Sequence, residues 1–425
     1  MDDPAKLNAA QTQAQKLYAE RERRFSDVVA LRQPDRVPIS YTSGFWHARY
    51  AGISNRTAMY DYEALAAAAM RAIRDLQPDS VNPPFSSTAL GPTLEMLGYK
   101  GYQWPGQSLP DDRPYQYLDK EYMRADEYDA FMEDPSWFVF TRILPRTTTA
   151  FEPLAKLPQL AARTSVRAPF FSRYFGDPEV AEAMVRIAAA GREALKMLER
   201  ANAFQRELIE LGFPIDRDAQ CYAPYDFFGD FLRGSKGIML DLFRHKDKLL
   251  EAMERLIPIM LRDVVTTAAG GPSKRVFIAL HWGLDGFMSP EQFKTFYWPQ
   301  LRKVLMALID KGFVPLVFWE GRCDSRFETI ADIPKGSCIY WFERSDLFRA
   351  KAVLGDVVCL RGNVPASMLI GGTPGEVRDY CRKLIEVVGK GGGFILDASS
   401  AIPQEARTEN VFAMYQATRE FGRYD

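Results

Sequence analysis

The stretch LVFWEG, residues 316–321, is an apolar run typical of a buried strand, and it stops on a carboxylate, Glu320, followed by a glycine. The same pattern recurs four more times in the second half of the chain. The runs are VFIALHWG (276–283), CIYWFER (338–344), VVCLRGNVP (357–365) and GFILDASS (393–400). Amphipathic stretches or short connections separate them, and this alternation predicts βα units and a parallel sheet.

Three further runs complete a set of eight strands: RVPISYT (36–42), DSVNPPF (79–85) and DAQCYAPYD (218–226). Eight parallel strands that alternate with helices predict a closed (β/α)8 TIM barrel, of class α/β. Ser289-Pro290 and Thr373-Pro374 mark helix starts between the strands. The doubly wound alternative requires a Gly-rich phosphate turn after an early strand, and the sequence has none there.

Two segments lie outside the barrel pattern. Residues 1–34 predict an N-terminal helical extension, and residues 86–209 predict a large, mostly helical insertion after the second strand. The insertion is expected to serve as a lid over the barrel mouth or as a subunit contact, so a homodimer is one arrangement under consideration. We interpret the whole chain, 1–425, as a single barrel domain.

The composition limits the function classes. The chain has 425 residues, of which 47% are hydrophobic, with 54 Lys and Arg against 55 Asp and Glu. This balance gives no basic excess for nucleic acid, and the apolar runs are too short to span a bilayer. The polar N-terminus contains no apolar signal segment, and the five cysteines are scattered singly. We therefore expect a cytoplasmic protein with reduced thiols that acts on a small molecule.

Polar residues follow nearly every predicted strand, and in a TIM barrel the carboxyl ends of the strands carry the active site. The candidate catalytic residues are Tyr222, Asp226, His281, Glu320 and Asp397. The candidate substrate-binding residues are Trp46, Asn82, Tyr225, Trp282, Phe318, Trp319, Arg344, Arg361 and Asn363. The candidate metal ligands are Glu320, Glu343 and His281, because carboxylates together with a histidine can bind a divalent ion or transfer protons.

Purely structural roles compete with these assignments. His281 could be a core histidine bonded to a backbone carbonyl, Glu320 could pair with Arg344 or Arg361, and Asp397 could cap the last turn. Glu320 follows Phe318 and Trp319, so we expect its carboxylate to be partly desolvated. The sequence contains no nucleophile elbow, phosphate loop or zinc-protease motif.

The chain resembles the uroporphyrinogen decarboxylase superfamily. The resemblance is clearest in RFSDVVALRQPDRVPIS (24–40), in FFGDFLRGSKGIMLDLFRHKDKLLEAM (227–253) and in the segment from LRGNVPASM to ENVFAM (360–414). It implies a (β/α)8 barrel and one of two chemistries. One is cofactor-independent decarboxylation of uroporphyrinogen; the other is methyl transfer to or from a corrinoid or thiol, usually on zinc.

Two departures from the superfamily pattern bear on the choice. The Arg-Gln-Ala-Gly run of the decarboxylases is absent from YTSGFWHARYAG (41–52). The His-x-Cys-Gly of the zinc methyltransferases is replaced by Phe318, Trp319, Glu320 and Gly321, and their final cysteine by the segment from Asp397 to Ser400. The resemblance leaves Glu343 as a ligand on the next strand, so a divalent ion, zinc if any, could still bind to Glu320, Glu343 and His281.

We hypothesise a methyltransferase that demethylates a small methoxylated or methylated compound, with a corrinoid on a separate protein as acceptor. The aromatic residues near the predicted mouth suit a flat or apolar substrate. The alternative is a cofactor-independent decarboxylase or lyase acting on a carboxylated, porphyrinogen-like compound. In that enzyme Arg344 and Arg361 would bind carboxylate, and Asp226 or Asp397 would handle the proton. A non-catalytic binding protein is a third hypothesis, disfavoured because clustered carboxylates are costly to retain.

Overall fold

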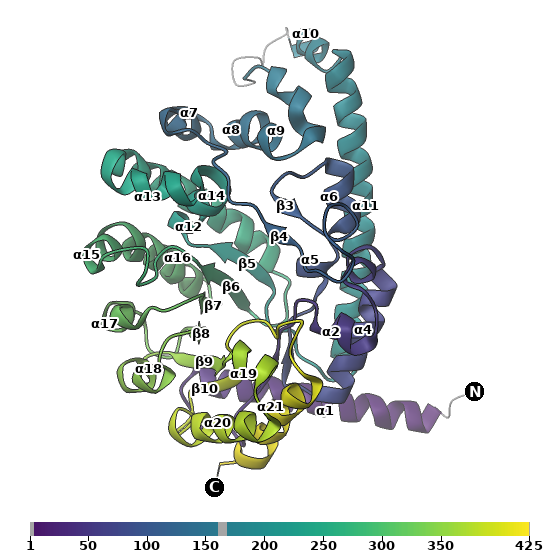
Figure 1. Cartoon of the computed structure of the whole chain (residues 1–425), viewed down its shortest axis with the longest axis vertical. Coiled ribbons are helices and arrows are strands. Elements are labelled where there is room, and N and C mark those ends of the chain that lie inside the picture. The colour runs from purple at the N-terminus through teal and green to yellow at the C-terminus, as the bar shows by residue number, and fades with distance from the viewer. Residues whose placement is uncertain (1–3, 160–167, 425) are drawn as a thin grey trace.

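The computed structural model describes residues 4–159 and 168–424, and it contains the predicted barrel of eight parallel strands (Figure 1). The strands are β1 (Ser40–Tyr41), β2 (Ser80–Val81), β5 (Ala219–Tyr222), β6 (Arg275–Leu280), β7 (Val314–Trp319), β8 (Ile339–Phe342), β9 (Cys359–Val364) and β10 (Phe394–Ala398). Strands β5 to β10 pair in sequence order, and β1 pairs with β2. Parallel bridges from Ile39 to Leu396 and from Val81 to Ile215 join the two sheets, so the barrel is closed.

The helices that follow the strands surround the barrel. They are α4 (Tyr62–Leu76), α11 (Pro178–Glu210), α14 (Lys246–Ala268), α16 (Trp298–Asp310), α17 (Phe327–Ile330), α18 (Leu347–Leu354), α20 (Pro374–Val387) and α21 (Thr408–Phe421). Shorter helices on the connections are α2 (Trp46–Ala51), α3 (Asn55–Tyr60), α12 (Pro224–Phe228), α13 (Gly234–Arg244), α15 (Pro290–Gln292) and α19 (Ala366–Gly371). Ser289 and Thr373 cap α15 and α20 as predicted, each accepting a hydrogen bond from the backbone three residues on. No described helix is long and apolar enough to cross a membrane.

The period of two along each strand sorts the side chains between the barrel interior and the helices. In β7, Leu316 and Phe318 belong to an interior cluster, whereas Val317 and Trp319 belong to the larger core under the helices. Trp319 packs against Phe342, which in turn packs on Phe327 of α17. The same alternation brings every second residue of the neighbouring strands into the barrel.

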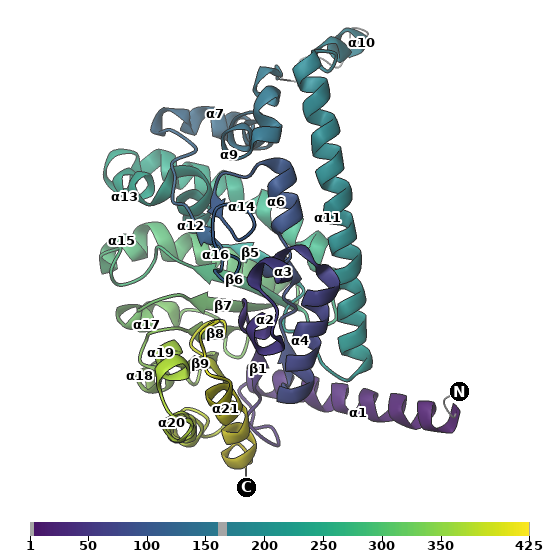
Figure 2. The same ribbon diagram turned by 45° about the vertical axis from the view of Figure 1, so that its right-hand side comes forward.

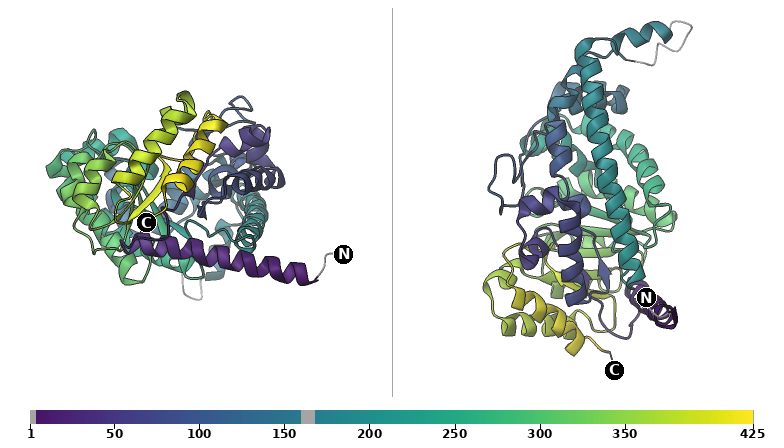
Figure 3. Two further views of the ribbon diagram at one scale, coloured as in Figure 1. Left: turned by 90° about the horizontal axis from the view of Figure 1, so that it is seen from below. Right: turned by 90° about the vertical axis from the view of Figure 1, so that its right-hand side faces the viewer.

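The predicted N-terminal extension is helix α1 (Pro4–Val29), and its C-terminal end closes the bottom of the barrel. Phe25, Val28 and Val29 pack with the interior residues of β7 to β10 in one apolar cluster. The N-terminal part of α1 extends away from the barrel (Figure 3, left). The bottom is therefore sealed by apolar side chains, and the opposite end of the barrel is left for a polar site.

The predicted insertion lies between β2 and β5 and is mostly helical, as expected. Besides α11 it contains α5 (Phe85–Thr88), α6 (Gly91–Leu97), α7 (Tyr128–Glu133), α8 (Pro135–Phe138), α9 (Leu144–Thr147), α10 (Ala168–Phe171) and several single turns. It also contains a short antiparallel ribbon, β3 (Tyr102–Gln103) and β4 (Gln116–Tyr117), which the sequence analysis did not predict. Helix α11 runs along the molecule past the barrel (Figure 2).

The insertion packs against the segment that follows β5. Arg233 donates to the Met123 carbonyl and to Glu121, and the Tyr117 hydroxyl donates to the Asp230 carbonyl at 2.8 Å. Asp241 accepts from both Arg233 and Tyr128. These bonds fix the chain around Asp230, which belongs to the site described below.

A fully buried arginine ties the barrel interior together. Arg361 of β9 donates to Asp397 of β10 at 2.8 Å, to Asp216 at 2.9 and 3.1 Å, and to the Thr42 hydroxyl at 3.2 Å. Arg361 and Asp397 are both 0% exposed, and the guanidinium also stacks 4.3 Å from the Trp341 ring centroid. This one cation therefore links β1, β9, β10 and the segment before β5.

Replacing Arg361 by leucine is expected to destabilise the protein by about 3–5 kcal/mol, because Asp216 and Asp397 would remain buried without a cation. The shift of the urea unfolding midpoint measures this loss. Arg344→Leu is the matched control, since the Arg344 side chain is 75% exposed, and it should leave the midpoint nearly unchanged. Equal, small shifts for both variants would contradict the structural role given to Arg361.

Candidate functional site

The strand register brings several predicted residues to one end of the barrel. Ala279 pairs with Phe318, Phe318 with Trp341, and Trp341 with Arg361, all facing the interior. Two residues further along each strand, the same alternation places His281, Glu320, Glu343 and Asn363 at the mouth. The predicted convergence of polar strand ends is therefore present for these four residues.

His281 lies between two carboxylates. Its Nδ1 is 2.7 Å from Asp230 Oδ2, and its Nε2 is 3.3 Å from Glu320 Oε2. The His281 side chain is 37% exposed and that of Glu320 is 50% exposed, whereas Asp230 is mostly buried. Both ring nitrogens can donate only when the imidazole is protonated, so this arrangement favours the cationic form of His281.

The electrostatics of His281 follow from these contacts. Burial alone would lower the pKa of His281, but the hydrogen bonds to Asp230 and Glu320 outweigh it and raise the pKa to about 11. Since this folded-state pKa exceeds the ordinary 6.5, the contribution of His281 to stability is complete below that ordinary value. It is lost as the pH rises toward 11.

Asp226 supports the site from below. It is buried, and it accepts hydrogen bonds from the backbone N–H groups of His281 and Trp282, at 2.9 and 3.1 Å, and from the Tyr297 hydroxyl at 2.7 Å. Burial raises the pKa of Asp226 to about 7, His281 opposes the rise, and Asp230 adds to it. Asp226 therefore fixes the backbone that carries the histidine, and it has no direct access to the mouth.

An aromatic rim stands beside His281. The Trp282 Nε1 donates to Asp230 at 2.8 Å, and the Trp282 ring meets Phe287 edge-on at 5.0 Å. Tyr222 meets Phe231 edge-on at 5.1 Å, and Phe231 and Phe287 are 37% and 42% exposed. A side chain at Gly229 would lie 2.4 Å from the Trp282 Nε1, so the glycine permits this close approach.

The surroundings of Glu320 differ from those predicted. Its ionic partner is His281, and neither of the two predicted structural partners, Arg344 and Arg361, contacts it. Phe318 and Trp319 point into the barrel and toward the helices, and Glu320 is half exposed at the rim, so about half of its side chain is shielded from water. Glu343, on the next strand, is 3.5 Å from Arg344. Burial raises the pKa of Glu343, Arg344 opposes the rise, and Glu320 adds to it.

A cavity of about 1150 Å³ adjoins this cluster on the side of the β7 to β10 loops. Glu343, Arg344 and Asn363 line it together with Arg322, Ser345 and Tyr380. Asn363 donates to the Ser345 carbonyl at 2.9 Å and accepts from the Tyr380 hydroxyl at 3.3 Å. Two predicted substrate-binding residues, Arg344 and Asn363, therefore share one cavity.

The structure places the remaining candidates elsewhere. Arg361 and Asp397 bind each other inside the barrel, which differs from the predicted turn cap as well as from a catalytic role at the mouth. Trp319 lies under the helices, Tyr225 donates its hydroxyl to the Ile238 carbonyl, and Trp46 donates to the Ala406 carbonyl. Phe318 stacks on Trp341 inside the barrel, and Asn82 is buried beside β1. These positions contact neither His281 nor Glu320 among the contacts described.

Two residues of the site, Asp230 and Tyr297, were not among the predicted ones. Asp230 follows Asp226 by four residues in YDFFGD, one helical turn on, so the spacing of the two aspartates could have indicated a shared face. Tyr297 lies in the turn before α16 and carries no comparable signal. Of the two, Asp230 matters more for the site, because it orients His281.

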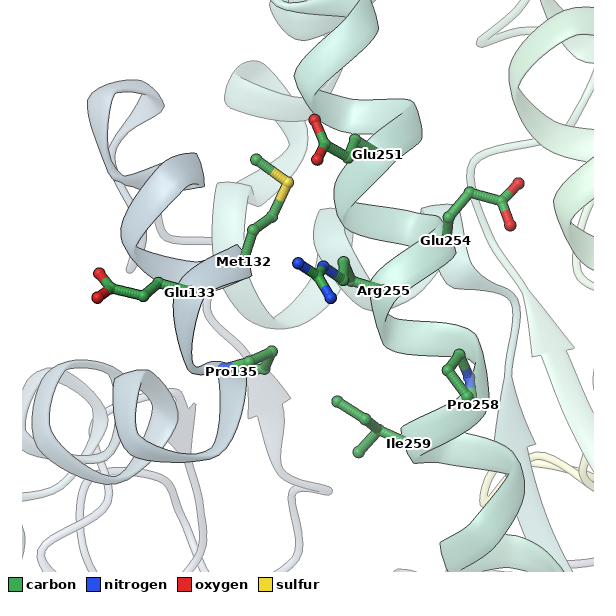
Figure 4. A pocket seen from close by; sticks show the side chains of 8 residues that line it. All are labelled: Met132, Glu133, Pro135, Glu251, Glu254, Arg255, Pro258 and Ile259. Atoms are coloured by element: carbon green, nitrogen blue, oxygen red, sulfur yellow. The ribbon is translucent and has the colours of Figure 1, made fainter. Parts of the chain in front are cut away.

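A second hollow, of about 440 Å³, lies between α7 and α14 and is separate from this cluster. Figure 4 shows Met132, Glu133 and Pro135 on one side of it and residues of α14 on the other. It is lined by none of the predicted site residues.

The predicted metal ligands are only partly assembled. His281 and Glu320 lie 3.3 Å apart, but no group of three His, Cys, Asp or Glu side chains in residues 4–159 and 168–424 is arranged to hold a metal ion. The donor set contains no thiolate, the ligand that most favours zinc. The residues present therefore do not fit the thiolate-rich zinc centre that the superfamily implies.

Comparison with known proteins agrees with the fold and with the resemblance. Residues 219–421 match the family model "Uroporphyrinogen decarboxylase (URO-D)". The uroporphyrinogen decarboxylase of Methylococcus capsulatus is 28% identical over 178 residues, and that of Psychromonas ingrahamii is 29% identical over 157 residues. The alignments span 41% and 36% of this chain, and 48% and 42% of the relatives, so only about half of each relative is matched.

A solved structure described as a methyltransferase from Methanosarcina mazei superposes with a TM-score of 0.61. The match covers 94% of this chain and 98% of that chain at 17% identity, which shows a shared fold. The chain therefore shares the fold of that structure over almost its whole length. It carries a URO-D domain over residues 219–421, which confirms the resemblance found in the sequence.

Nitrogen NMR of the imidazoles tests the state of His281, because the chain has only two other histidines, His47 and His245. His281 should stay protonated at pH 9, whereas His47, whose pKa burial lowers to about 4, should be neutral. Asp230→Asn should lower the pKa of His281, since it removes the hydrogen bond that raises it most. A His281 that titrates near 6.5 in the wild type would refute the assignment.

Metal analysis of protein purified without chelator should find substoichiometric zinc, because the ligand set is incomplete. Stoichiometric metal that is lost in both His281→Asn and Glu320→Gln would show that these side chains form a metal centre after all. Glu133→Gln, at the remote hollow of Figure 4, is the control and should not change metal content.

Proposed function

We propose that the protein is a methyltransferase of the uroporphyrinogen decarboxylase-like type that demethylates a small methoxylated or methylated compound. The observation that carries the proposal is the position of His281 between Asp230 and Glu320 beside an aromatic rim, an arrangement that favours its protonated form. Demethylation needs a group that protonates the leaving heteroatom, and His281 is placed for that role. The methyl acceptor is a corrinoid presented by a separate protein.

The reaction breaks the bond between the methyl carbon and an oxygen or nitrogen of the substrate. The methyl group passes to the acceptor, the heteroatom keeps the electron pair, and His281 Nε2 supplies the proton. In the free enzyme Glu320 Oε2 lies 3.3 Å from that Nε2, and the Glu320 side chain is half exposed. A substrate heteroatom that displaces Glu320 removes one carboxylate from the ring, which lowers the pKa of His281 toward the working range of a general acid.

The charge of the cluster selects among substrates. Asp226, Asp230 and Glu320 surround one histidine, and Glu343 lies beside them. A porphyrinogen with several carboxylates needs several fixed cations, and this cluster presents carboxylates instead. Neutral or cationic methylated compounds suit it better, which favours demethylation over decarboxylation of a porphyrinogen.

The rim suits an acceptor that approaches from outside. A corrinoid supplies a nucleophilic centre that takes up the methyl group, and its flat face needs apolar, accessible contacts. Phe231 and Phe287 are exposed; Phe231 packs on Tyr222, and Phe287 packs on Trp282, the residue after His281. These residues would receive the acceptor, and Trp282 would separate it from the Asp230 carboxylate.

A carboxy-lyase is the second candidate, favoured by a different observation. Arg322 and Arg344 line the cavity of about 1150 Å³ beside Glu343. They could bind a single carboxylate, and His281 could then protonate the carbanion left by loss of carbon dioxide. This enzyme would act on a monocarboxylate, since these two arginines are loosely paired, at 3.8 Å from Asp324 and 3.5 Å from Glu343.

Turnover of methoxylated and methylated amine compounds with free cob(I)alamin as acceptor tests the main proposal. Wild-type protein should transfer methyl groups from at least one compound, and His281→Asn should lose about 100-fold or more of the rate, the usual scale for a general acid. His245→Asn is the matched control, because it makes the same substitution at the junction of α13 and α14. Release of carbon dioxide from a carboxylated compound without methyl transfer would replace the main proposal with the second.

A further inference from the structure

The barrel lumen is filled on one side and open on the other. The inward-facing residues of β8 to β10 are all buried. On β5 and β6 the inward-facing pairs are Gln220 with Phe277 and Tyr222 with Ala279, in the same phase as Leu316 of the interior cluster. Gln220 is exposed and the other three residues of these pairs are partly exposed, whereas the residues between them are buried. Solvent therefore enters the lumen beside β5 and β6.

Arg217, in the connection that leads into β5, reaches into this open part of the lumen. Its guanidinium lies 4.0 Å from the centroid of the Phe277 ring, and the residue is partly buried. Within residues 4–159 and 168–424 this guanidinium forms no ion pair and no hydrogen bond; the adjacent carboxylate, Asp216, is bound by Arg361 instead. Burial lowers the pKa of Arg217 to about 10, and Asp216 opposes the fall, so the side chain remains a cation at neutral pH.

Two side-chain amides in the same space also lack partners. Ser80 of β2 faces the interior, because its hydroxyl donates to Asp216 at 2.9 Å, and Asn82 follows it in the same phase. Asn82 is only 6% exposed, yet its side-chain amide makes no hydrogen bond to any described residue, and neither does that of Gln220. Buried amides are usually paired, so a ligand that supplies the acceptor accounts for these groups.

A purely structural role would make Arg217 a distant counter-ion. Arg361 serves two carboxylates, Asp216 and Asp397, so a second cation nearby would balance their charge. The geometry favours a ligand instead, because Arg217 forms an ion pair with neither carboxylate and lies against Phe277, on the open side of the lumen. A cation placed there costs desolvation energy, and an incoming anion offsets that cost.

We propose that Arg217 binds a single carboxylate of the substrate inside the barrel, with Asn82 and Gln220 donating hydrogen bonds beside it. The reacting end at His281 is that of the proposed function, on which this assignment of the substrate class rests. The substrate is therefore a methylated or methoxylated monocarboxylic acid. A second negative charge would face the two buried aspartates of the lumen without a cation of its own.

The two ends of such an acid suit two regions of opposite charge. Phe277 and His281 are about 13 Å apart along the extended chain of β6, a span that a small elongated acid bridges. Carboxylates surround His281, so the methylated end placed there is neutral or cationic, while the cation in the lumen takes the anionic end. Arg344 at the rim is a weaker candidate, because its side chain is 75% exposed and ion pairs in solvent contribute little.

Calorimetric titration of the full chain with pairs of acids and amides tests the proposal without any methyl acceptor. The pairs are benzoate with benzamide and para-methoxybenzoate with para-methoxybenzamide, which differ in charge and hardly in shape. The wild type should bind at least one acid about tenfold or more tightly than its amide. In Arg217→Met the two affinities should become equal. Both ligands are titrated into the same protein, so their ratio does not depend on the fraction that is folded.

Arg262→Met is the matched control, since Arg262 is exposed on α14, and it should keep the wild-type preference. A wild type that does not prefer the acids overturns the proposal, and so does a preference that survives in Arg217→Met. A preference that survives there but is lost in Arg344→Met would place the carboxylate in the rim cavity. Failure of methyl transfer alone counts against the proposed function and leaves the carboxylate preference in place.

Discussion

The buried ion pairs of Arg361 are the constraint on which the barrel interior depends. One guanidinium binds Asp216, Asp397 and Thr42. These residues lie before β5, on β10 and just after β1. Buried carboxylates are costly without a cation, so these groups can coexist only if the strands keep their register. Two residues further along the strands, the same register sets the positions of His281, Glu320, Glu343 and Asn363 at the mouth.

Above the layer of Arg361, three carboxylates bind different atoms of one histidine, His281. Asp226 binds the backbone, Asp230 binds Nδ1, and Glu320 binds Nε2. The inner two are shielded, whereas Glu320 is half exposed and makes the longest contact. The cluster can therefore open on the Glu320 side while the histidine stays oriented from behind, which is the arrangement that a proton donor to a substrate requires.

Much of the fold could be predicted from the sequence, because the local sequence patterns favour the same helices and strands that the folded chain contains. The eight strands, the helical insertion and the caps at Ser289 and Thr373 were all predicted from apolar runs, amphipathic stretches and N-cap residues. The ribbon of β3 and β4 was missed, because strands of two residues carry no periodic signal. Closure of the barrel was predicted from the number of strands, although β1 and β2 are very short.

The site was predicted only in part, because a strand end does not tell which way a side chain points. Glu320, His281 and Asn363 share the inward phase of their strands, but Trp319 has the opposite phase, and Tyr225 turns toward α13. Asp397 and Arg361 have the inward phase and yet satisfy each other one layer below the mouth. Asp230 belongs to a turn whose orientation depends on bonds to the insertion, which no local pattern encodes.

The central claim is that Asp230 and Glu320 keep His281 charged so that it can donate a proton. The pH dependence of kcat/KM, compared between the wild type and Asp230→Asn, tests it most directly. Activity should fall on the alkaline side as His281 loses its proton, and this fall should move to lower pH in the variant. A profile whose alkaline side is the same in both proteins would contradict the account.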